Sequence, residues 1–418
     1  MQSFAKPILV AARNSPLSKV QVQEVEESLR GFYPEIQFSP IWLDTRGDRD
    51  QKTSLKTLPR DDFFTRELDE ALFRGNVRAA IHSAKDLACP IPPGLAIVAL
   101  TAGRDGRDAL VLRKEDTLSA LPKNARIATS STRRDALIGA LRADLQSVDI
   151  RGTIEKRLSE LASRKVDGII MAMCALERLR ISDYTIIPLD GPHARFQGRL
   201  AVLARDDDTE MCELFSPLDT KKTLYFGLRQ KQQKGIRCQP LIEIVPLPCS
   251  LRALASSSHI LVTSRTSLDL LRPFLETTSL QKEIISIGRK TSALAREIGF
   301  KTIHTARTET SEGVIELLGR LKLQDAKIFW PHSSLSRRTI PSYLEGANIS
   351  FSECELYTTR TKRHVEKCAL DQIDELFFSS PSTVDAFFEL YGLPPDDILI
   401  RTQGAITYNY LKEKNSLL

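Results

Sequence analysis

Short apolar runs alternate with amphipathic helical patterns along the whole of this 418-residue chain. Residues 8–12 (ILVAA) are typical of a buried strand, and residues 17–29 repeat apolar positions at helical spacing. In the first half the alternation continues with strand-like runs at 77–82, 94–100, 108–113, 126–129, 168–173 and 200–204, and with a helical pattern at 132–143. Such alternation favours α/β architecture with largely parallel sheets.

The pattern restarts near residue 222. A polar stretch at 205–210 (RDDDTE) ends the first series, and a strand-like run at 223–228 (TLYFGL) opens a second one, followed by 240–247 (PLIEIVPL). At roughly 100–200 residues per domain the chain is long enough for several domains. We therefore predict a main boundary near residue 218.

Charge and hydropathy exclude several classes of protein. Residues 1–218 carry 32 basic and 31 acidic side chains, and residues 219–418 carry 27 and 22, so neither half has the lopsided charge of a nucleic-acid-binding protein. Apolar runs such as 168–176 are too short to span a bilayer. The apolar stretch at 8–12 is stopped by Arg13 and is too short for a signal peptide. We expect a soluble protein of the cytoplasm that binds neither nucleic acid nor membrane.

The seven cysteines stand singly, without a CxxC pair and without histidines at metal-ligand spacing. This arrangement argues against a disulfide framework and against a structural zinc site. We expect small buried thiols in a reducing compartment and no bound metal.

Two consecutive arginines lie at the start of the helical pattern at 132–143. Ser131 is suited to cap this helix, which places Arg133 and Arg134 in its first turn. The helix dipole disfavours cations there, so helix propensity does not explain the pair. A bound anion explains it, because free N–H groups and two guanidinium groups converge on one spot. A salt bridge to a neighbouring acid is the alternative.

Further charged side chains stand at comparable junctions. Arg13 follows the first strand-like run, and Arg151 and Arg157 follow later ones. Arginines at several strand ends of an open α/β sheet indicate a ligand with several carboxylates or phosphates. Lys85 and Asp86 leave the end of the run at 77–82, where a carboxylate among arginines can stabilise a cationic intermediate or move a proton. A salt bridge within a loop is the alternative for Asp86.

These residues belong to an ordered series of motifs: ARNSPL, TRGD, FFTRELDEAL, HSAKD, RDGRDAL, ATSSTRRDAL, DIRGT and EKRL. With them, residues 7–205 closely resemble porphobilinogen deaminase, also called hydroxymethylbilane synthase. The resemblance implies two open-sheet domains like those of periplasmic binding proteins. It also implies head-to-tail joining of porphobilinogen units, with release of ammonia, on a dipyrromethane primer that the family holds covalently on a cysteine.

The resemblance also implies roles for individual side chains. Asp86 would be the catalytic carboxylate, which stabilises the pyrrole nitrogens as the aminomethyl carbon becomes electrophilic. The acetate and propionate groups of substrate and primer would be held by the cations Arg13, Lys85, Arg133, Arg134, Arg151 and Arg157. Hydrogen bonds would come from the hydroxyl groups of Ser15, Ser83, Thr129, Ser130 and Ser131.

Two features depart from the family pattern. Where a Gly-Lys-Gly loop is usual, this chain reads PRDD at 59–62, with Arg60 as its one cation. The family's third domain, which carries the attaching cysteine in a glycine-rich loop, does not follow residue 210, and Cys238 lacks the double glycine of that loop. Cys89 is the thiol that the sequence places nearest to the proposed chemistry, and we expect a structural role for it. We therefore predict that any dipyrromethane is bound non-covalently.

From residue 222 the chain resembles a second family, uroporphyrinogen-III synthase. The matching motifs are PLIEI, LVTS, IGRKTSALAREI, YTT, FFSSP and GAIT. The resemblance implies two α/β domains, one formed by 222–252 with 362–418 and the other by 253–361. It also implies cyclisation of hydroxymethylbilane, with inversion of ring D, to uroporphyrinogen III.

Candidate site residues in this half follow apolar strands. Ser264, Ser380 and Thr407 are suited to bind carboxylates, and plain helix capping is the alternative. Tyr357 is the candidate acid that assists loss of the hydroxyl group of hydroxymethylbilane, and a half-buried strand tyrosine is the alternative.

The leading hypothesis is a fused enzyme of tetrapyrrole biosynthesis that acts on small polycarboxylate pyrroles, with a deaminase-like region at 1–218 and a synthase-like region at 219–418. One alternative is a porphobilinogen- or polypyrrole-binding module fused to a monofunctional synthase. Asp86 argues against it, because binding polycarboxylates gains nothing from a central carboxylate. The other alternative is a decayed front half, against which the complete set of arginines argues.

Overall fold

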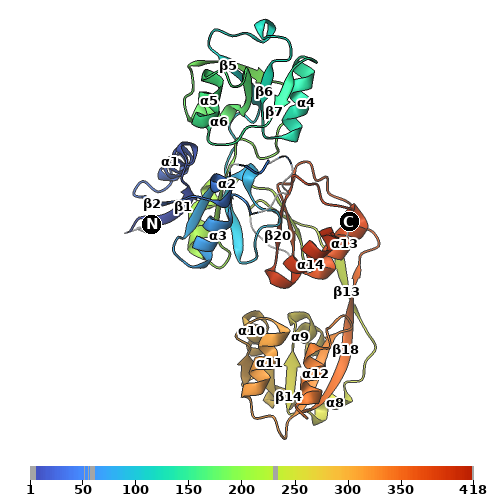
Figure 1. The fold of residues 1–418 in the computed structure, drawn as a ribbon. Coiled ribbons are helices and arrows are strands. Elements are labelled where there is room, and N and C mark those ends of the chain that lie inside the picture. Colours follow the sequence, from blue (N-terminus) through green and yellow to red (C-terminus); the bar gives the residue numbers. More distant parts are fainter. Residues whose placement is uncertain (1–5, 51, 55, 57–61, 229–233, 417–418) are drawn as a thin grey trace. The chain divides into compact units, whose positions relative to one another are not determined.

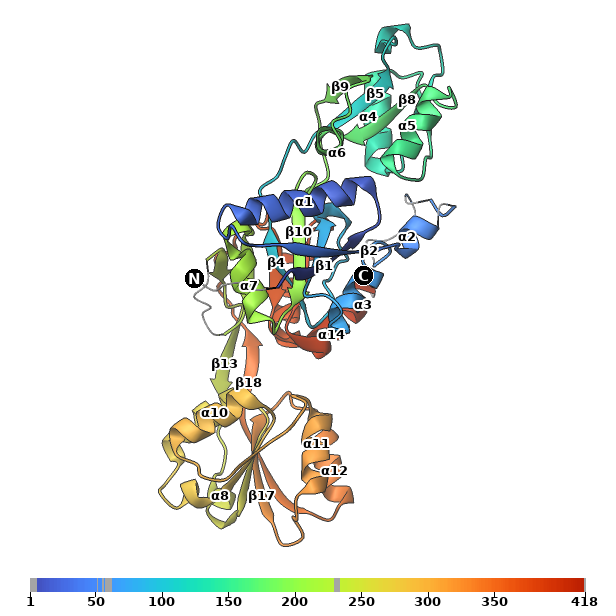
Figure 2. The ribbon, with the colours of Figure 1, turned by 90° about the vertical axis from the view of Figure 1, so that its left-hand side faces the viewer.

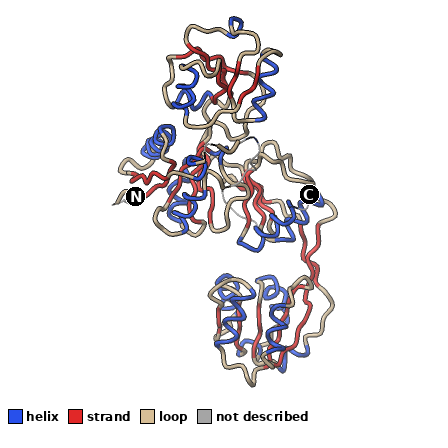
Figure 3. Tube along the Cα trace, in the orientation of Figure 1, coloured by secondary structure: helices blue, strands red, loops and turns tan. Residues whose placement is uncertain are grey.

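The computed structural model describes residues 6–416 except 51, 55, 57–61 and 229–233 (Figure 1). The chain forms two compact units, one of Met1–Pro240 with Glu366–Leu418 and one of Leu241–Val365. Every sheet consists of strands flanked by helices (Figure 3). The strands and helices expected from the apolar pattern of the first half are all present, with ends that differ by a few residues.

The first unit begins with a five-stranded sheet in the order β2-β1-β3-β10-β4. Its strands are β1 Ile8–Arg13, β2 Phe38–Leu43, β3 Ala79–Ser83, β4 Leu95–Leu100 and β10 Leu200–Arg205. β1, β2 and β3 are parallel, whereas β10 lies between β3 and β4 and is antiparallel to both. This sheet carries Arg13 and the Lys85–Asp86 segment at strand ends.

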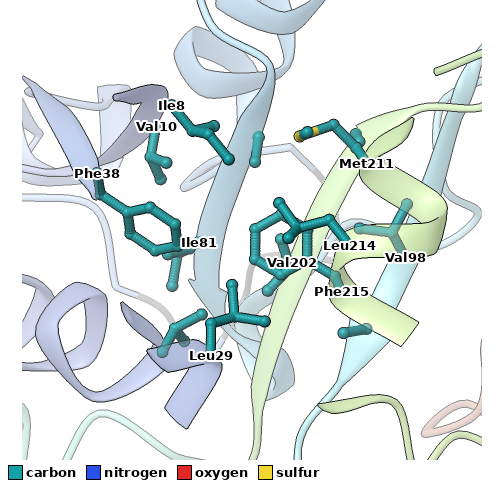
Figure 4. Close-up of a cluster of buried hydrophobic side chains, with 14 of the residues drawn as sticks. Ile8, Val10, Leu29, Phe38, Ile81, Val98, Val202, Met211, Leu214 and Phe215 are labelled. Carbon is teal, nitrogen blue, oxygen red and sulfur yellow. The ribbon is translucent and has the colours of Figure 1, made fainter. Parts of the chain in front are cut away.

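Helices cover both faces of this sheet. α1 (Pro16–Arg30) and α7 (Thr209–Phe215) lie over one face (Figure 2), where Leu29 and Phe215 pack on Val10 and Val202 (Figure 4). α3 (Arg66–Phe73) packs on the other face, and the short helix α2 (Arg46–Arg49) follows β2. Successive side chains of each strand point alternately to the two faces of the sheet, as the pleat of a strand requires.

The second sheet of this unit has the order β7-β6-β8-β5-β9. Its strands are β5 Asp108–Arg113, β6 Arg126–Ala128, β7 Gln146–Val148, β8 Gly168–Ala172 and β9 Tyr184–Leu189. Its helices are α4 Thr132–Leu141, α5 Ile154–Ala162 and α6 Met173–Arg178. β5 is antiparallel to both β8 and β9.

The expectation of largely parallel sheets is therefore wrong for these two sheets, which are mixed. The chain leaves the first sheet after β4 and returns to it with β10. As a result, β5 in the second sheet and β10 in the first are antiparallel to the strands beside them. An apolar run is equally buried in either direction, so the sequence pattern does not reveal this reversal.

The third sheet of the first unit is parallel and has the order β12-β11-β19-β20. Its strands are β11 Thr223–Phe226, β12 Ile236–Cys238, β19 Glu375–Phe378 and β20 Leu399–Thr402, and its helices are α13 Pro381–Tyr391 and α14 Gly404–Ser416. Phe226 stacks on Phe378 at 5.1 Å between ring centres, and Phe387 stacks on Tyr391 at 4.8 Å. Residues far apart in the sequence thus form one aromatic core.

The second unit is a six-stranded sheet in the order β13-β18-β17-β14-β15-β16. Its strands are β13 Ile242–Pro246, β14 His259–Val262, β15 Glu283–Ser286, β16 Ile303–Thr305, β17 Lys327–Ser333 and β18 Ser350–Thr361. Its helices are α8 Arg252–Ser256, α9 Arg265–Leu271, α10 Arg289–Ile298, α11 Ser311–Arg320 and α12 Thr339–Gly346. α8, α9 and α10 pack on one face, and α11 and α12 pack on the other (Figure 2).

Candidate active site

Asp86 ends a single turn of 3-10 helix, Ala84–Asp86, that directly follows β3. The Ala84 N–H donates to the carbonyl oxygen of Arg199 (3.1 Å), which fixes the start of the turn against the strand β10. Asp86 is half-buried, and its carboxylate forms no hydrogen bond or ion pair with any residue that the structure describes. Its charge acts on Lys85 and Arg157. The turn therefore presents a carboxylate beside cations but bonded to none of the described ones.

Lys85 forms a hydrogen bond with Gln197, which the sequence did not identify as a site residue. The Lys85 Nζ donates to Gln197 Oε1 at 3.0 Å. Burial, followed by the positive charge of Arg134, lowers the pKa of Lys85. The Nε2 of Gln197 donates to Asp108 Oδ1 at 2.8 Å. Gln197 thus connects the Lys85–Asp86 turn to the first residue of β5 in the second sheet.

The double arginine at the start of α4 shares one acid. Arg133 Nη1 lies 2.7 Å from Asp108 Oδ2, and Arg134 Nη2 lies 2.7 Å from Asp108 Oδ1. Burial raises the pKa of Asp108, but the two guanidinium groups outweigh it and hold that pKa below its usual value. The salt bridge named as the alternative is therefore present for both arginines. Two cations against one carboxylate still leave an excess of positive charge.

Arg13 is held at the end of β1 by Asp48 and an aromatic ring. Its Nε donates to Asp48 Oδ2 at 3.2 Å, and its guanidinium lies 4.5 Å from the centre of the Phe64 ring. Burial opposes ionisation of Asp48, but Arg13 keeps the pKa of that carboxyl below its usual value. Burial and the charge of Arg13 lower the pKa of His82 to about 3, so this imidazole is neutral near pH 7.

Arg151 and Arg157 form no ion pair with an acid among the described residues. Arg151 Nη2 donates to the carbonyl oxygen of Asp50 (2.7 Å), whereas its Nε and Nη1 are buried without a partner among the described residues. Burial and the charges of Arg134 and Arg151 lower the pKa of Arg157 to about 10. Buried N–H groups without acceptors are costly, so an anion placed here would be strongly favoured.

Two of the predicted hydroxyl groups lie beside β1 and β3. Ser15 is the N-cap of α1 and accepts a hydrogen bond from the Ser18 N–H (3.2 Å). Ser83, the last residue of β3, accepts one from Gln21 Nε2 (2.9 Å). Both hydroxyl groups are therefore engaged within the protein.

The other three stand where β6 leads into α4. Thr129 is fully buried and accepts a hydrogen bond from the Ser131 N–H (3.3 Å), and Ser130 donates to the carbonyl oxygen of Ile150. Ser131 is the N-cap of α4, as predicted, but its side chain makes no capping hydrogen bond. Its hydroxyl group thus stands at the start of the helix that carries Arg133 and Arg134.

Arg178 also supports the segment that carries Gln197, and the sequence did not identify it as a site residue. Arg178 donates through Nη2 to the carbonyl oxygen of Gly198 (2.8 Å) and through Nε to Glu24 (2.9 Å). Gly198 has φ +93°, and a Cβ there would lie 2.6 Å from the carbonyl oxygen of Arg104. Only glycine fits this position. The Gln-Gly pair at 197–198 is the one sequence signal that could have drawn attention to this segment.

The two cysteines nearest to the turn in the sequence and in charge interactions, Cys89 and Cys174, occupy structural positions, as expected. The Cys89 Sγ donates a hydrogen bond to the carbonyl oxygen of Ile398 (3.4 Å). Cys174, expected in the core, is buried but close enough to Lys85 for their charges to interact. Burial raises the pKa of the Cys174 thiol. A buried thiol with a raised pKa is a poor nucleophile, so Cys174 offers no reactive thiolate.

The candidate residues of the back half belong to different units. Tyr357, on β18, is buried, and its hydroxyl group lies 3.0 Å from Ser264 Oγ, at the N-cap of α9. Ser380 is the N-cap of α13, and Thr407 is buried on α14. The structure thus brings Tyr357 and Ser264 together.

Arg60, the cation predicted in the PRDD loop, lies outside the described residues. Among those described, no group of three or more His, Cys, Asp or Glu side chains could hold a metal ion. No helix in the described part of the chain is both long and apolar enough to cross a membrane.

Two family models match the chain. Residues 8–213 match "Porphobilinogen deaminase, dipyromethane cofactor binding domain", and residues 229–416 match "Uroporphyrinogen-III synthase HemD". The matches cover the two regions that the sequence motifs distinguished, and both families act in tetrapyrrole biosynthesis.

Individual relatives agree with the first match. The "Probable porphobilinogen deaminase" of Chlamydia pneumoniae is 38% identical over 213 residues, which cover 51% of this chain and 90% of the relative. The porphobilinogen deaminase of Roseiflexus sp. (strain RS-1) is 37% identical over 216 residues, covering 51% of this chain and 71% of the relative. Uroporphyrinogen-III synthetase from Helicobacter pylori 26695 is 15% identical with a TM-score of 0.36, covering 47% of this chain and 90% of that one, which is too distant to support a conclusion. The chain belongs to the porphobilinogen deaminase family, with a uroporphyrinogen-III synthase region fused behind it.

Proposed function

We propose that residues 1–218 condense porphobilinogen to hydroxymethylbilane and that residues 219–418 cyclise this product to uroporphyrinogen III. The observation that carries the first activity is the Asp86 carboxylate, which has no bonding partner among the described residues and stands beside Lys85 and Arg157. Loss of ammonia from the aminomethyl group of porphobilinogen leaves a cation that is shared with the pyrrole nitrogen. A fixed carboxylate would stabilise this cation before the next pyrrole carbon attacks it and loses a proton.

The residues also fit the dipyrromethane that the family model names. The buried, unpartnered N–H groups of Arg151 and the lowered pKa of Arg157 mark a site that lacks negative charge. Arg133, Arg151 and Arg157 would hold the carboxylates of a dipyrromethane, which, when bound, supplies the terminal pyrrole to which the first substrate unit is joined. Because the Cys89 Sγ is hydrogen-bonded to a backbone carbonyl oxygen and Cys174 is buried, we propose that these ionic contacts anchor it without a thioether.

The intact mass of the purified protein tests this anchoring. Denaturing mass spectrometry should give the mass of the polypeptide alone, whereas a native measurement at low salt should show bound dipyrromethane. Ionic anchoring is screened by salt, so the bound fraction should fall as ionic strength rises. An added mass that survives denaturation and disappears in Cys89→Ser, Cys174→Ser or Cys238→Ser would contradict the proposal and identify the attachment residue.

For the second activity, the Tyr357–Ser264 pair is the candidate acid. A tyrosine hydroxyl can donate a proton to the leaving hydroxyl group of hydroxymethylbilane, and Ser264 would orient it. Ser380 and Thr407 are proposed to bind substrate carboxylates.

Incubation of the full chain with porphobilinogen tests both activities together. The proposal requires ammonia release and accumulation of the type III isomer of uroporphyrinogen, measured by chromatography. Binding of porphobilinogen without ammonia release would instead favour a binding module fused to a synthase. Formation of the type I isomer alone would contradict the synthase assignment. The described cysteines form no disulfide, which is typical of a reducing compartment, and we propose that the enzyme acts in the cytoplasm.

A further inference from the structure

The synthase-like and deaminase-like regions share a hydrophobic core within the first unit. The side chain of Leu399, on β20, is fully buried in a cluster with Leu68, Leu87 and Ile97 of the front half. β20 is an edge strand, and the Ile91 N–H donates to the carbonyl oxygen of Ile400 on it (2.8 Å). The front half thus satisfies backbone groups of an edge strand that would otherwise be exposed.

Two arginines of the front half bind residues of the back half. Arg199 donates from Nη1 to Asp374 Oδ1 (2.8 Å), and both side chains are mostly buried, with 18% and 15% exposed. The other oxygen of Asp374 accepts the backbone N–H of Lys222 (2.9 Å). Arg195 donates to the carbonyl oxygens of Leu370, Asp371 and Ile373. Arg199 is held in turn by hydrogen bonds from Nε to the carbonyl oxygen of Thr101 (2.9 Å) and from Nη2 to Thr220 Oγ1 (2.8 Å), so the ion pair is fixed from both ends.

The same segment reaches the candidate active site on its other side. The carbonyl oxygen of Arg199 accepts the N–H of Ala84, which opens the turn that carries Lys85 and Asp86. Two residues earlier, Gln197 accepts the hydrogen bond of Lys85. Gly198, between them, cannot be replaced without a clash, so this stretch has little freedom to adjust. A displacement of Arg199 would therefore move the turn.

We propose that the Arg199–Asp374 ion pair is a positioning contact, through which the synthase-like region holds Lys85 and Asp86 in the geometry that porphobilinogen turnover needs. The inference rests on the proposed deaminase activity of the front half. It makes the fused region part of the deaminase site rather than a neighbour that merely shares the chain. Neither Arg199 nor Asp374 touches substrate in this scheme.

The test uses the full chain with Arg199→Met, Asp374→Ala and the double variant. Each single variant should lower kcat for porphobilinogen consumption by about tenfold or more, because small displacements of reacting groups are costly. The KM should change by less than about twofold, and the double variant should be no slower than the worse single variant, since both remove one contact. Conversion of added hydroxymethylbilane to uroporphyrinogen III should stay within about twofold of the parent, which reports that the back half is folded.

Asp397→Asn is the matched control. Asp397 pairs with Arg195 at 3.4 Å in the same interface but is 61% exposed. Its loss should leave kcat within about twofold, as expected for an exposed ion pair. Unchanged kcat in the Asp374→Ala variant, or additive losses in the double variant, would overturn the proposal.

Hydrogen–deuterium exchange gives a readout that does not depend on turnover. Amides in a peptide covering 80–88 should exchange about fivefold or more faster in Asp374→Ala and at the parental rate in Asp397→Asn. If the parent chain itself does not consume porphobilinogen, the proposed function fails, and the exchange of this peptide still decides whether Asp374 positions the turn. Unchanged exchange in Asp374→Ala would overturn the inference. Should Arg199→Met not fold, Asp374→Asn gives the same decision.

Discussion

The amide of Gln197 accepts a hydrogen bond from Lys85 through Oε1 at 3.0 Å and donates another to Asp108 through Nε2 at 2.8 Å. The neutral side chain of Gln197 therefore stands between the Lys85 ammonium group and the Asp108 carboxylate, which already forms ion pairs with Arg133 and Arg134. Without it, Lys85 would compete with these arginines for Asp108. The arrangement leaves Asp86 as the carboxylate of the site that no described cation occupies.

Asp86→Asn should lower porphobilinogen consumption about a hundredfold or more, because the amide keeps the shape of the carboxylate but not its charge. Asp183→Asn, at an exposed position, should behave like the parent. Ammonia release at saturating porphobilinogen measures the difference. Near-normal turnover in Asp86→Asn would remove the catalytic role from this residue.

Arg151→Leu should weaken binding of a polycarboxylate pyrrole by about 1.5–3 kcal/mol, the usual contribution of a hydrogen bond to a charged group. The parent should lose affinity as salt is raised, and the variant should lose less, because one ionic contact is already gone. Arg126→Leu, at the exposed start of β6, provides the control. Calorimetric titration with dipyrromethane would measure both effects, and equal affinities for Arg151→Leu and the parent would contradict the anion site.

Tyr357→Phe and Ser264→Ala should each slow formation of the type III isomer, because each removes one partner of the 3.0 Å contact between the two hydroxyl groups. Spontaneous closure gives the type I isomer, so the isomer ratio from added hydroxymethylbilane is the measurement. Tyr343→Phe, at a half-buried position on α12, is the control. A parental ratio in Tyr357→Phe would leave this tyrosine with a packing role.

Asp69, on α3, should make the stability of the protein depend on pH. Burial raises the pKa of this carboxyl to about 7 in the folded chain, well above its ordinary value of 3.8. The folded state therefore binds a proton that the unfolded state has released between these two values, so the free energy of unfolding falls as the pH rises through this window. Asp69→Asn should accordingly stabilise the protein more at pH 8 than at pH 5, measured as the change in Tm. Glu70→Gln, at an exposed position on α3, should show no such difference, and neither result depends on enzymatic activity.

Leu399→Ala should destabilise the front half although the substitution lies in the back half. A buried leucine truncated to alanine costs about 2–5 kcal/mol, and the cavity would form beside Leu68 and Leu87. The chain has two tryptophans, so Trp330→Phe leaves Trp42 on β2 as a fluorescent reporter of the front half. In that background Leu399→Ala should lower the unfolding midpoint reported by Trp42, whereas Leu393→Ala, 61% exposed, should not. Equal midpoints would show that the two regions unfold independently.

The sequence predicts the strands of the front half well because their burial depends on local apolar runs. Ile8–Arg13 and Leu200–Arg205 are both found where such runs lie. The direction of a strand cannot be predicted in this way. β10 is antiparallel to its neighbours because of the path that the chain takes through the second sheet, and a local apolar run does not reveal that path.

The site is predictable only in part for a similar reason. Lys85 and Asp86 stand together in the sequence, and Ser131 marks the helix start at which Arg133 and Arg134 gather. Gln197 is 112 positions away from Lys85, and a lone glutamine carries no chemical signal until the chain folds.

The burial of Leu399 also constrains the order of events on the ribosome. The front half leaves the exit tunnel first, but Leu399, which completes the cluster around Leu68 and Leu87, is made long after these two residues. Until then the surface near Ile91 has nothing to cover it, and a nascent chain with exposed apolar surface is prone to aggregation. Premature termination upstream of β20 would therefore yield a front half that contains every proposed deaminase residue but requires a chaperone to remain in solution.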